Sequence, residues 1–385
     1  MEIKGCKLEF ELVPQSPMIH FQWDESGVTL RASEVKPKLD KFLEKKKGNI
    51  PQNWKIDKDK RALNYKMHIT LRQNSIIKPP HKIFYGNTHN EEDVDFKEKK
   101  AVTSYPNVAI MCFDNDLLHF IKDNIWEFFV VTNFGTMQNR GFGSFIIADN
   151  NKTEKDIVRA FKDNGVKAVY KAENVRKNKD QFGFIDSFYR IMKSGYNLTK
   201  KNSKAYARSQ LFNFVKDRYS MENEKKFLKL VAETDGEKNN LENKHKYVRG
   251  LIGKGEIVHT KPNTKKYVVT ITHNSQKGKI DRIPSIVRFK IINSTVYILG
   301  YPVLEKIYGK KFVFRFGKPK NTSYCLQIPE KQDFNNETGF PIEEFLDYYV
   351  PLYNGEIKEK GNDMPIPERF AKIFNVIFKK VVKCK

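Results

Sequence analysis

The sequence contains little cysteine. Its 385 residues include four cysteines, Cys6, Cys112, Cys325 and Cys384, which lie far apart and form no C-x-x-C pair. This spacing argues against a zinc site and indicates a reducing compartment. The histidines likewise show no metal-ligand spacing, so we predict no bound metal.

Long apolar runs are also missing. No run reaches the roughly 18 residues that a membrane-spanning helix needs, and the first residues show no signal-peptide pattern. We therefore expect a cytoplasmic protein without membrane contact. The sequence has no nucleotide-binding glycine pattern, serine elbow or polymerase-like acid pair, and we predict no cofactor.

Acidic residues are too few to balance the basic ones. Lysine and arginine total 70 against 46 aspartates and glutamates, giving a formal charge of +24 spread along the chain. Such an excess favours a polyanionic partner. The 17 tyrosines and 29 phenylalanines provide rings on which unpaired bases can stack, although most phenylalanines are expected in the core. This composition predicts single-stranded RNA as a partner.

One glycine-rich stretch stands out at residues 129–147. An apolar run, interpreted as a strand, enters a loop with three glycines, and a second apolar run leaves it. Gly141 and Gly143 flank Phe142 directly after Arg140, which suits a phosphate at the amides and guanidinium and a base at the ring. The alternative is a tight hairpin whose arginine points into water.

The elements up to this loop follow the β-α-β-β-α-β order of ferredoxin-like and RNA-recognition modules. Alternation predicts strands over 7–13 and 65–71, a buried strand over 108–113, and a helix capped by Asp114. The first helix begins near Ser33, which we expect as a cap. Arg31, Lys36 and Lys38 then surround free amides as a candidate anion site, or form an ordinary solvated helix start.

The sequence pattern of the second half of the chain predicts another α+β domain. We place the domains at 1–150 and 151–385, with a Thr153/Asp156 capping pair opening the second. Residues 182–250 are predicted mainly helical and form a helical insertion. Strands are expected over 166–170, 267–272, 286–292, 296–299 and 312–316, and a basic amphipathic helix over the last residues.

Three segments carry a family resemblance. The loop FGTMQNRGFGSF at 134–145 resembles the glycine-rich loop of the RAMP superfamily, the ferredoxin-like RNA-binding subunits of class 1 CRISPR effector complexes. LRASEVKPKL at 30–39 resembles the opening of that family's first helix, with Ala32 and Pro37 where glycines are usual. The segments at 247–253 and 282–290, the latter with Arg282, Ser285 and Arg288, are similar to parts of the Cmr-type terminal subunit.

The resemblance implies two ferredoxin-like domains and an RNA-binding subunit of a type III effector complex in antiviral defence. It would grip crRNA or the crRNA–target duplex, with other effector subunits as partners. The alternative is an endoribonuclease. In that case His20 would deprotonate a 2′-hydroxyl during guide processing, or Asp24 would hold a metal for target cutting. Neither has a visible supporting partner in the sequence, so we expect binding without cleavage.

Overall fold

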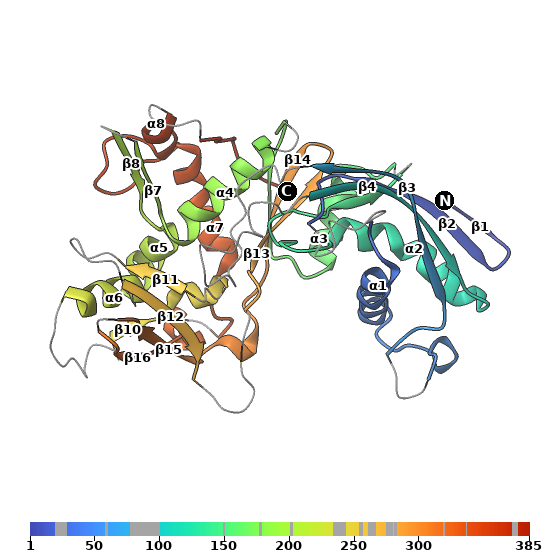
Figure 1. Cartoon of the computed structure of the whole chain (residues 1–385), viewed down its shortest axis with the longest axis horizontal. Helices are drawn as coiled ribbons and strands as arrows, with labels where there is room; N and C mark the ends of the chain where they lie inside the picture. Colours follow the sequence, from blue (N-terminus) through green and yellow to red (C-terminus); the bar gives the residue numbers. More distant parts are fainter. Residues whose placement is uncertain are drawn as a thin grey trace.

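The computed structural model shows that both halves of the chain contain a ferredoxin-like unit (Figure 1). It describes residues 1–19, 29–57, 61–77, 101–148, 151–176, 179–200, 203–233, 244–253, 257–260, 267–274, 280, 283–318, 320–335, 337–371 and 376–385. Helices and antiparallel sheets alternate in both units, so the predicted α+β class is confirmed.

The first unit follows the predicted order. Its elements are β2 (Lys7–Pro14), α1 (Ala32–Lys47), β3 (Lys66–Ile77), β4 (Ala101–Met111), α2 (Asn115–Val131) and β5 (Phe145–Ile147), preceded by β1 (Glu2–Lys4). The sheet runs β5-β2-β4-β3, the spatial order of a ferredoxin-like fold. Leu8, Phe10 and Leu12 of β2 face the core beneath α1 and α2, as their alternation predicts.

The second unit repeats this topology with long interruptions. It consists of β6 (Ala168–Ala172), α4 (Lys179–Lys193), β13 (Val287–Ile292), β14 (Thr295–Gly300), α7 (Ile342–Asn354) and β17 (Val382–Lys383). Its sheet runs β13-β14-β6-β17. Asn293 and Ser294 both have positive φ and close the hairpin that pairs β13 with β14, near the strands predicted over 286–292 and 296–299.

The interruptions form the elements drawn at the left of Figure 1, some at the lower left and others at the upper left. The predicted helical insertion holds α5 (Gln210–Tyr219) and α6 (Glu224–Glu233), together with β7 (Tyr196–Lys200), β8 (Ser203–Ala207), β9 (Glu222–Asn223), β10 (His245–Lys246), β11 (Ile257–Thr260) and β12 (Tyr267–His273). A second interruption adds β15 (Lys311–Phe316) and β16 (Ser323–Gln327), and α8 (Ile366–Ala371) follows α7. The strands β11-β12-β15-β16-β10-β9 form one sheet from both interruptions.

Three local predictions were wrong. Residues 129–131 end helix α2 and do not form a strand, because this apolar run continues the helix's buried face. Residues 196–200 and 203–207 lie in the range predicted mainly helical, but they form strands β7 and β8, in which Tyr196 to Lys200 pair with Ser203 to Ala207. Of the predicted tail helix, Phe370 lies in α8, but residues 376–381 lack helical structure and β17 pairs with β6.

Helix α3 (Glu154–Asp163) joins the two units. The predicted capping box between Thr153 and Asp156 is present at its start. Its apolar face packs with Val130 of α2 and with Val169 and Leu299 of the second sheet. The boundary that we place at residue 150 stays a prediction, because α3 contacts both units.

Candidate nucleic-acid interface

The glycine-rich loop is held by its own backbone. Gly141 and Gly143 have φ values of 84° and 68°, and a Cβ on Gly143 would lie 1.9 Å from the carbonyl oxygen of Phe134. The Gly143 amide donates to the Pro17 carbonyl (2.9 Å) and the Gly141 amide to that of Gln138 (3.2 Å). These amides are therefore not free to bind a phosphate, and this part of the prediction is wrong.

Phe142 does not offer its ring to a base. Its side chain is 2% exposed and stacks on Phe182 of α4, with ring centroids 3.9 Å apart. The predicted stacking role is therefore corrected: the ring joins the first unit to the core of the second.

Arg140 points into the second unit and not into water. Its guanidinium lies 3.2 Å above the ring centroid of Tyr189 on α4. The loop is fixed there because the Phe289 amide of β13 donates to the Asn139 carbonyl (3.1 Å), while the Asn133 side-chain amide donates to the Phe289 carbonyl (2.9 Å). Burial lowers the pKa of Arg140, which nonetheless remains a cation.

Tyr189 is the centre of this arrangement. Its hydroxyl lies 3.2 Å from the Ser285 hydroxyl and donates to the Ile252 carbonyl (3.2 Å). Burial alone would raise the pKa of Tyr189, but the nearby charges of Lys193 and Arg140 outweigh burial and lower it. Two cations therefore lie over this ring, Arg140 at 3.2 Å and Lys193 at 5.7 Å from its centroid.

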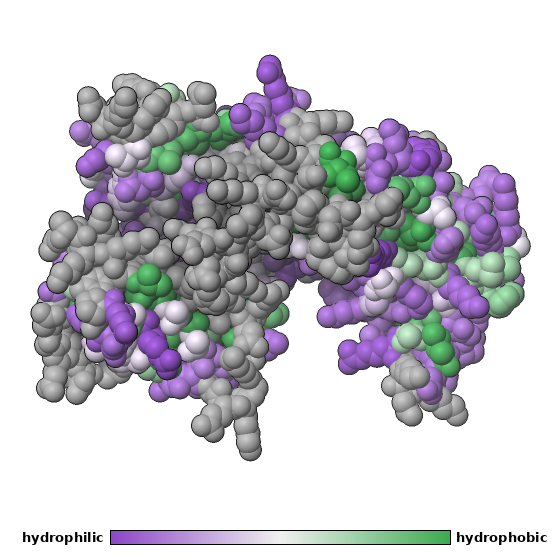
Figure 2. Space-filling view, viewed as in Figure 1, coloured by the Kyte–Doolittle hydropathy of each residue, from purple (hydrophilic) through white to green (hydrophobic). Residues whose placement is uncertain are grey.

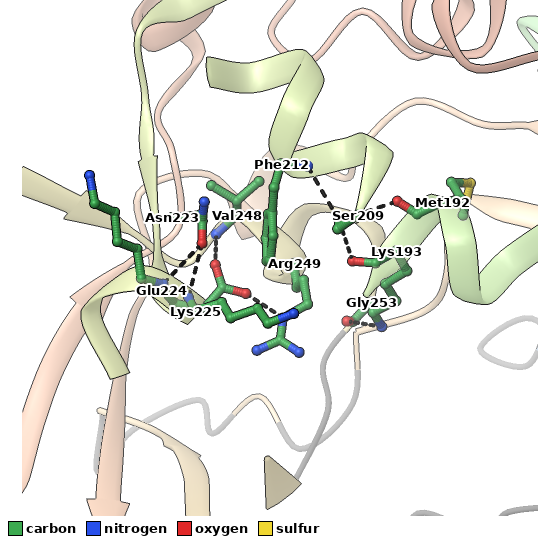
Figure 3. Close-up of polar contacts among 11 residues, drawn as sticks. Met192, Lys193, Ser209, Phe212, Asn223, Glu224, Lys225, Val248, Arg249 and Gly253 are labelled. Carbon is green, nitrogen blue, oxygen red and sulfur yellow. Dashed lines mark hydrogen bonds and ion pairs between the residues drawn. The ribbon is translucent and has the colours of Figure 1, made fainter. Parts of the chain in front are cut away.

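Two further cations complete the group. The Lys193 ammonium donates to the Gly253 carbonyl (2.7 Å; Figure 3), and burial lowers its pKa, with Arg140 and Arg249 lowering it further. Arg249 donates through Nε to Glu224, which is fully buried and also accepts from the Val248 amide. Its buried Nη2 finds no hydrogen-bond partner among the residues that the structure describes.

We call Arg140, Tyr189, Lys193, Arg249 and Ser285 the junction cluster. They come from the loop of the first unit, from α4, from the segment between β10 and β11, and from the segment that precedes β13. Three cations and two hydroxyls meet here, with Glu224 and Asp186 as nearby carboxylates. Cations and hydroxyls brought together in this way suit a phosphate group.

Arg288 lies next to the junction cluster. Its Nε donates to the Ser285 carbonyl (3.2 Å) and its guanidinium lies 4.2 Å above the ring of Tyr301. It also lines a pocket of about 150 Å³ together with Gln138 and Asn139 of the glycine-rich loop. The structure thus brings the two predicted segments together, although Arg282 is outside the described residues.

The predicted anion site at the first helix is not supported. The Lys36 ammonium donates to Asp40 (2.9 Å) and to the Leu63 carbonyl (2.9 Å). Lys38 donates to Glu34 (3.1 Å) and to the Asn133 carbonyl (3.2 Å), so it fixes the glycine-rich loop. Both lysines bind the chain itself.

The start of α1 also differs from the prediction. Arg31 takes the N-cap position in place of Ser33, and its side chain makes no capping bond. Ser33 is exposed.

The two catalytic candidates, His20 and Asp24, lie outside the described residues. Within the part of the chain that is described, no group of three acidic, histidine or cysteine side chains is placed to hold a metal. Among the same residues, no helix is long and apolar enough to cross a membrane.

Sequence reasoning missed Tyr189 and Lys193 as functional candidates. Both lie on a helix that was predicted for its apolar spacing, and spacing does not show which polar side chains meet another domain. Arg249 had a signal, since it lies in the segment at 247–253 that resembles the family.

Two family models match this chain. The Cmr1 N-terminal domain model matches residues 5–196 and the Cmr1 C-terminal domain model matches residues 206–382, so together they cover nearly the whole chain. No curated protein matches it.

Two solved structures are similar. The crystal structure of apo Cmr1 from Pyrococcus furiosus is 10% identical over 83% of this chain and 93% of that chain, with a TM-score of 0.34. A chain of the Type III-B Cmr-beta complex bound to cognate target RNA is 12% identical, with a TM-score of 0.25. That match spans 37% of this chain and 58% of the other. From the two family models we conclude that this chain belongs to the Cmr1 family, among the RAMP-type subunits of type III CRISPR effector complexes.

Proposed function

We propose that this chain binds RNA at the junction cluster as a subunit of a type III effector complex. The RNA is single-stranded crRNA or the crRNA–target duplex. The observation that carries the proposal is the convergence of Arg140 and Lys193 on the ring of Tyr189, with Arg249 close enough to lower the pKa of Lys193. Cations that are removed from water repel one another, and a bound phosphate would reduce that repulsion.

The surroundings of the cluster fit the proposal. The +24 charge draws a polyanion toward the molecule. Hydrophilic residues line the side of the first unit that borders the notch between the two halves (Figure 2). Arg288 and the exposed Gln138 add donors next to the cluster.

The test is RNA binding by Arg140→Gln and Lys193→Gln. Each variant should lose about 1–3 kcal/mol of affinity for single-stranded RNA, the range for a charge-assisted hydrogen bond. The plot of log affinity against log salt should also flatten by about 0.7 for each phosphate that the variant no longer neutralises. Thermal unfolding of the same samples gives the folded fraction by which the affinity is corrected.

Arg176→Gln is the matched control, because Arg176 is an exposed arginine outside the cluster. It should change affinity and salt slope far less. Equal losses in all three variants would mean that net charge, and not the cluster, binds RNA. An unchanged affinity per folded molecule in the two cluster variants would make the cluster purely structural.

A further inference from the structure

A second basic pocket lies on the insertion side of the molecule. It has a volume of about 500 Å³ and is formed by α5, α7 and the loop after α7. We call it the α5/α7 pocket. It shares no residue with the junction cluster, and the Ser209 side chain, which caps α5, donates to the Lys193 carbonyl (2.9 Å) between the two sites (Figure 3).

The rim of the α5/α7 pocket is cationic. Arg208, Lys216, Lys358 and Lys360 all line it, and all four are exposed. Their charged groups make no hydrogen bond or ion pair with residues that the structure describes. The exposed carboxylate on the rim, Asp217, accepts from the Tyr348 hydroxyl (3.4 Å). The rim therefore carries an excess of positive charge for a ligand.

A buried carboxylate organises the floor. Glu359 is 3% exposed and accepts from Arg369 (2.9 Å), from the Gln210 side chain (2.9 Å) and from the Arg208 amide (3.0 Å). These donors compensate its charge, so it does not repel an anion as a free carboxylate would. They also fix the loop, which places the neighbouring Lys358 and Lys360 on the rim.

Apolar and amide surfaces complete the pocket. Tyr348 is partly exposed and packs against Phe214, with ring centroids 5.4 Å apart. Ile357 is 49% exposed beside it, an unusual position for a large aliphatic side chain in a basic loop. Asn213 lies on the same wall, where its side-chain amide donates to Gln210 (3.3 Å) and Glu359 (3.4 Å). A planar ring with polar edges suits this combination better than a flexible acidic peptide does.

We propose that the α5/α7 pocket binds one unpaired nucleotide. Its phosphate lies among the lysines and Arg208, and its base lies against Tyr348 and Ile357. The assignment does not depend on RNA binding at the junction cluster, because the two sites use different residues.

Titration calorimetry of the full chain with adenosine 5′-monophosphate tests the assignment. Lys358→Ala with Lys360→Ala should weaken binding about tenfold or more, and Tyr348→Leu about tenfold, as expected for losing a stacked base. Lys4→Ala with Lys66→Ala removes the same charge from exposed lysines of the first unit and should change affinity less than about twofold.

In an Arg140→Gln background, Lys358→Ala with Lys360→Ala should still weaken nucleotide binding about tenfold or more, even where RNA binding is abolished, which separates this proposal from the previous one. Equal weakening by the Lys4/Lys66 pair would overturn the assignment, because binding would then follow net charge alone. Inorganic phosphate binding as tightly as the nucleotide, with no effect of Tyr348→Leu, would also overturn it, since the base would make no contact. A titration that shows no binding of the nucleotide would also overturn the assignment.

Discussion

At the scale of single residues, the glycine-rich loop depends on close backbone contact. Gly143 has a φ of 68° and lies where any Cβ would collide with the Phe134 carbonyl. Its own carbonyl accepts from the Phe134 amide (3.0 Å), so the backbone cannot move away without breaking that bond. This glycine therefore serves the geometry of the loop that carries Arg140.

We expect Gly143→Ala to destabilise the protein by about 3 kcal/mol or more, because strain and a backbone collision act together. Urea unfolding measures the change. Gly5→Ala is the control: Gly5 has a φ of 58° but no atom within 4 Å of an added Cβ, so it should lose only about 1 kcal/mol. Similar losses at both positions would show that conformation alone matters at Gly143.

At the scale of elements, a lysine of the second unit caps a helix of the first. Lys290 of β13 is 1% exposed, and its ammonium donates to the carbonyls of Phe129 (2.7 Å) and Thr132 (2.8 Å) at the end of α2. Helix carbonyls at a C-terminus attract a cation. Burial lowers the pKa of Lys290 well below its usual value. The interaction orients α2, and hence the loop after it, on the second sheet.

Lys290→Met should destabilise the protein by about 1–3 kcal/mol, since two buried carbonyls lose their donor. The loss should grow with pH. The folded state binds fewer protons at Lys290 than the unfolded state does between the lowered pKa and about 10.4, so the stability contributed by Lys290 rises with pH in that window.

Urea unfolding at about pH 7 and about pH 9.5 measures this difference. Lys311→Met, an exposed strand lysine, should have little effect at either pH. A loss at Lys290 that shrinks as the pH rises would contradict the assignment.

At the scale of the whole molecule, two ferredoxin-like units and the insertion form one chain (Figure 1). This chain has a formal charge of +24. Between them the loop of the first unit and α4 of the second bring the junction cluster together. The cluster holds cations and hydroxyls, which suit contacts with a phosphate group.

We predict that the purified protein binds RNA and leaves it intact, with or without magnesium. Labelled repeat RNA and guide–target duplex are incubated with the protein and examined for discrete products. Products that disappear with Asp24→Ala would establish metal-dependent cutting, and products that disappear with His20→Ala would establish guide processing. Either result would replace the binding-only prediction.

The sequence by itself determined the ferredoxin-like order of the first unit. Alternation in β2 specifies its buried face, and Asp114 caps α2 by accepting from the Leu117 amide (2.9 Å), because these signals act within a few residues. The family resemblance was likewise readable from short segments. Local patterns, however, state only that a residue is buried or charged.

Only the tertiary structure decided which partner each residue meets. Phe142 could stack on a base or on Phe182, and Lys38 could bind a phosphate or the glycine-rich loop, with the same local sequence. Tyr189 is distant from Arg140 along the chain, and no periodicity links them. Contacts between units depend on how whole surfaces pack, so the junction cluster could not be derived before the fold was known.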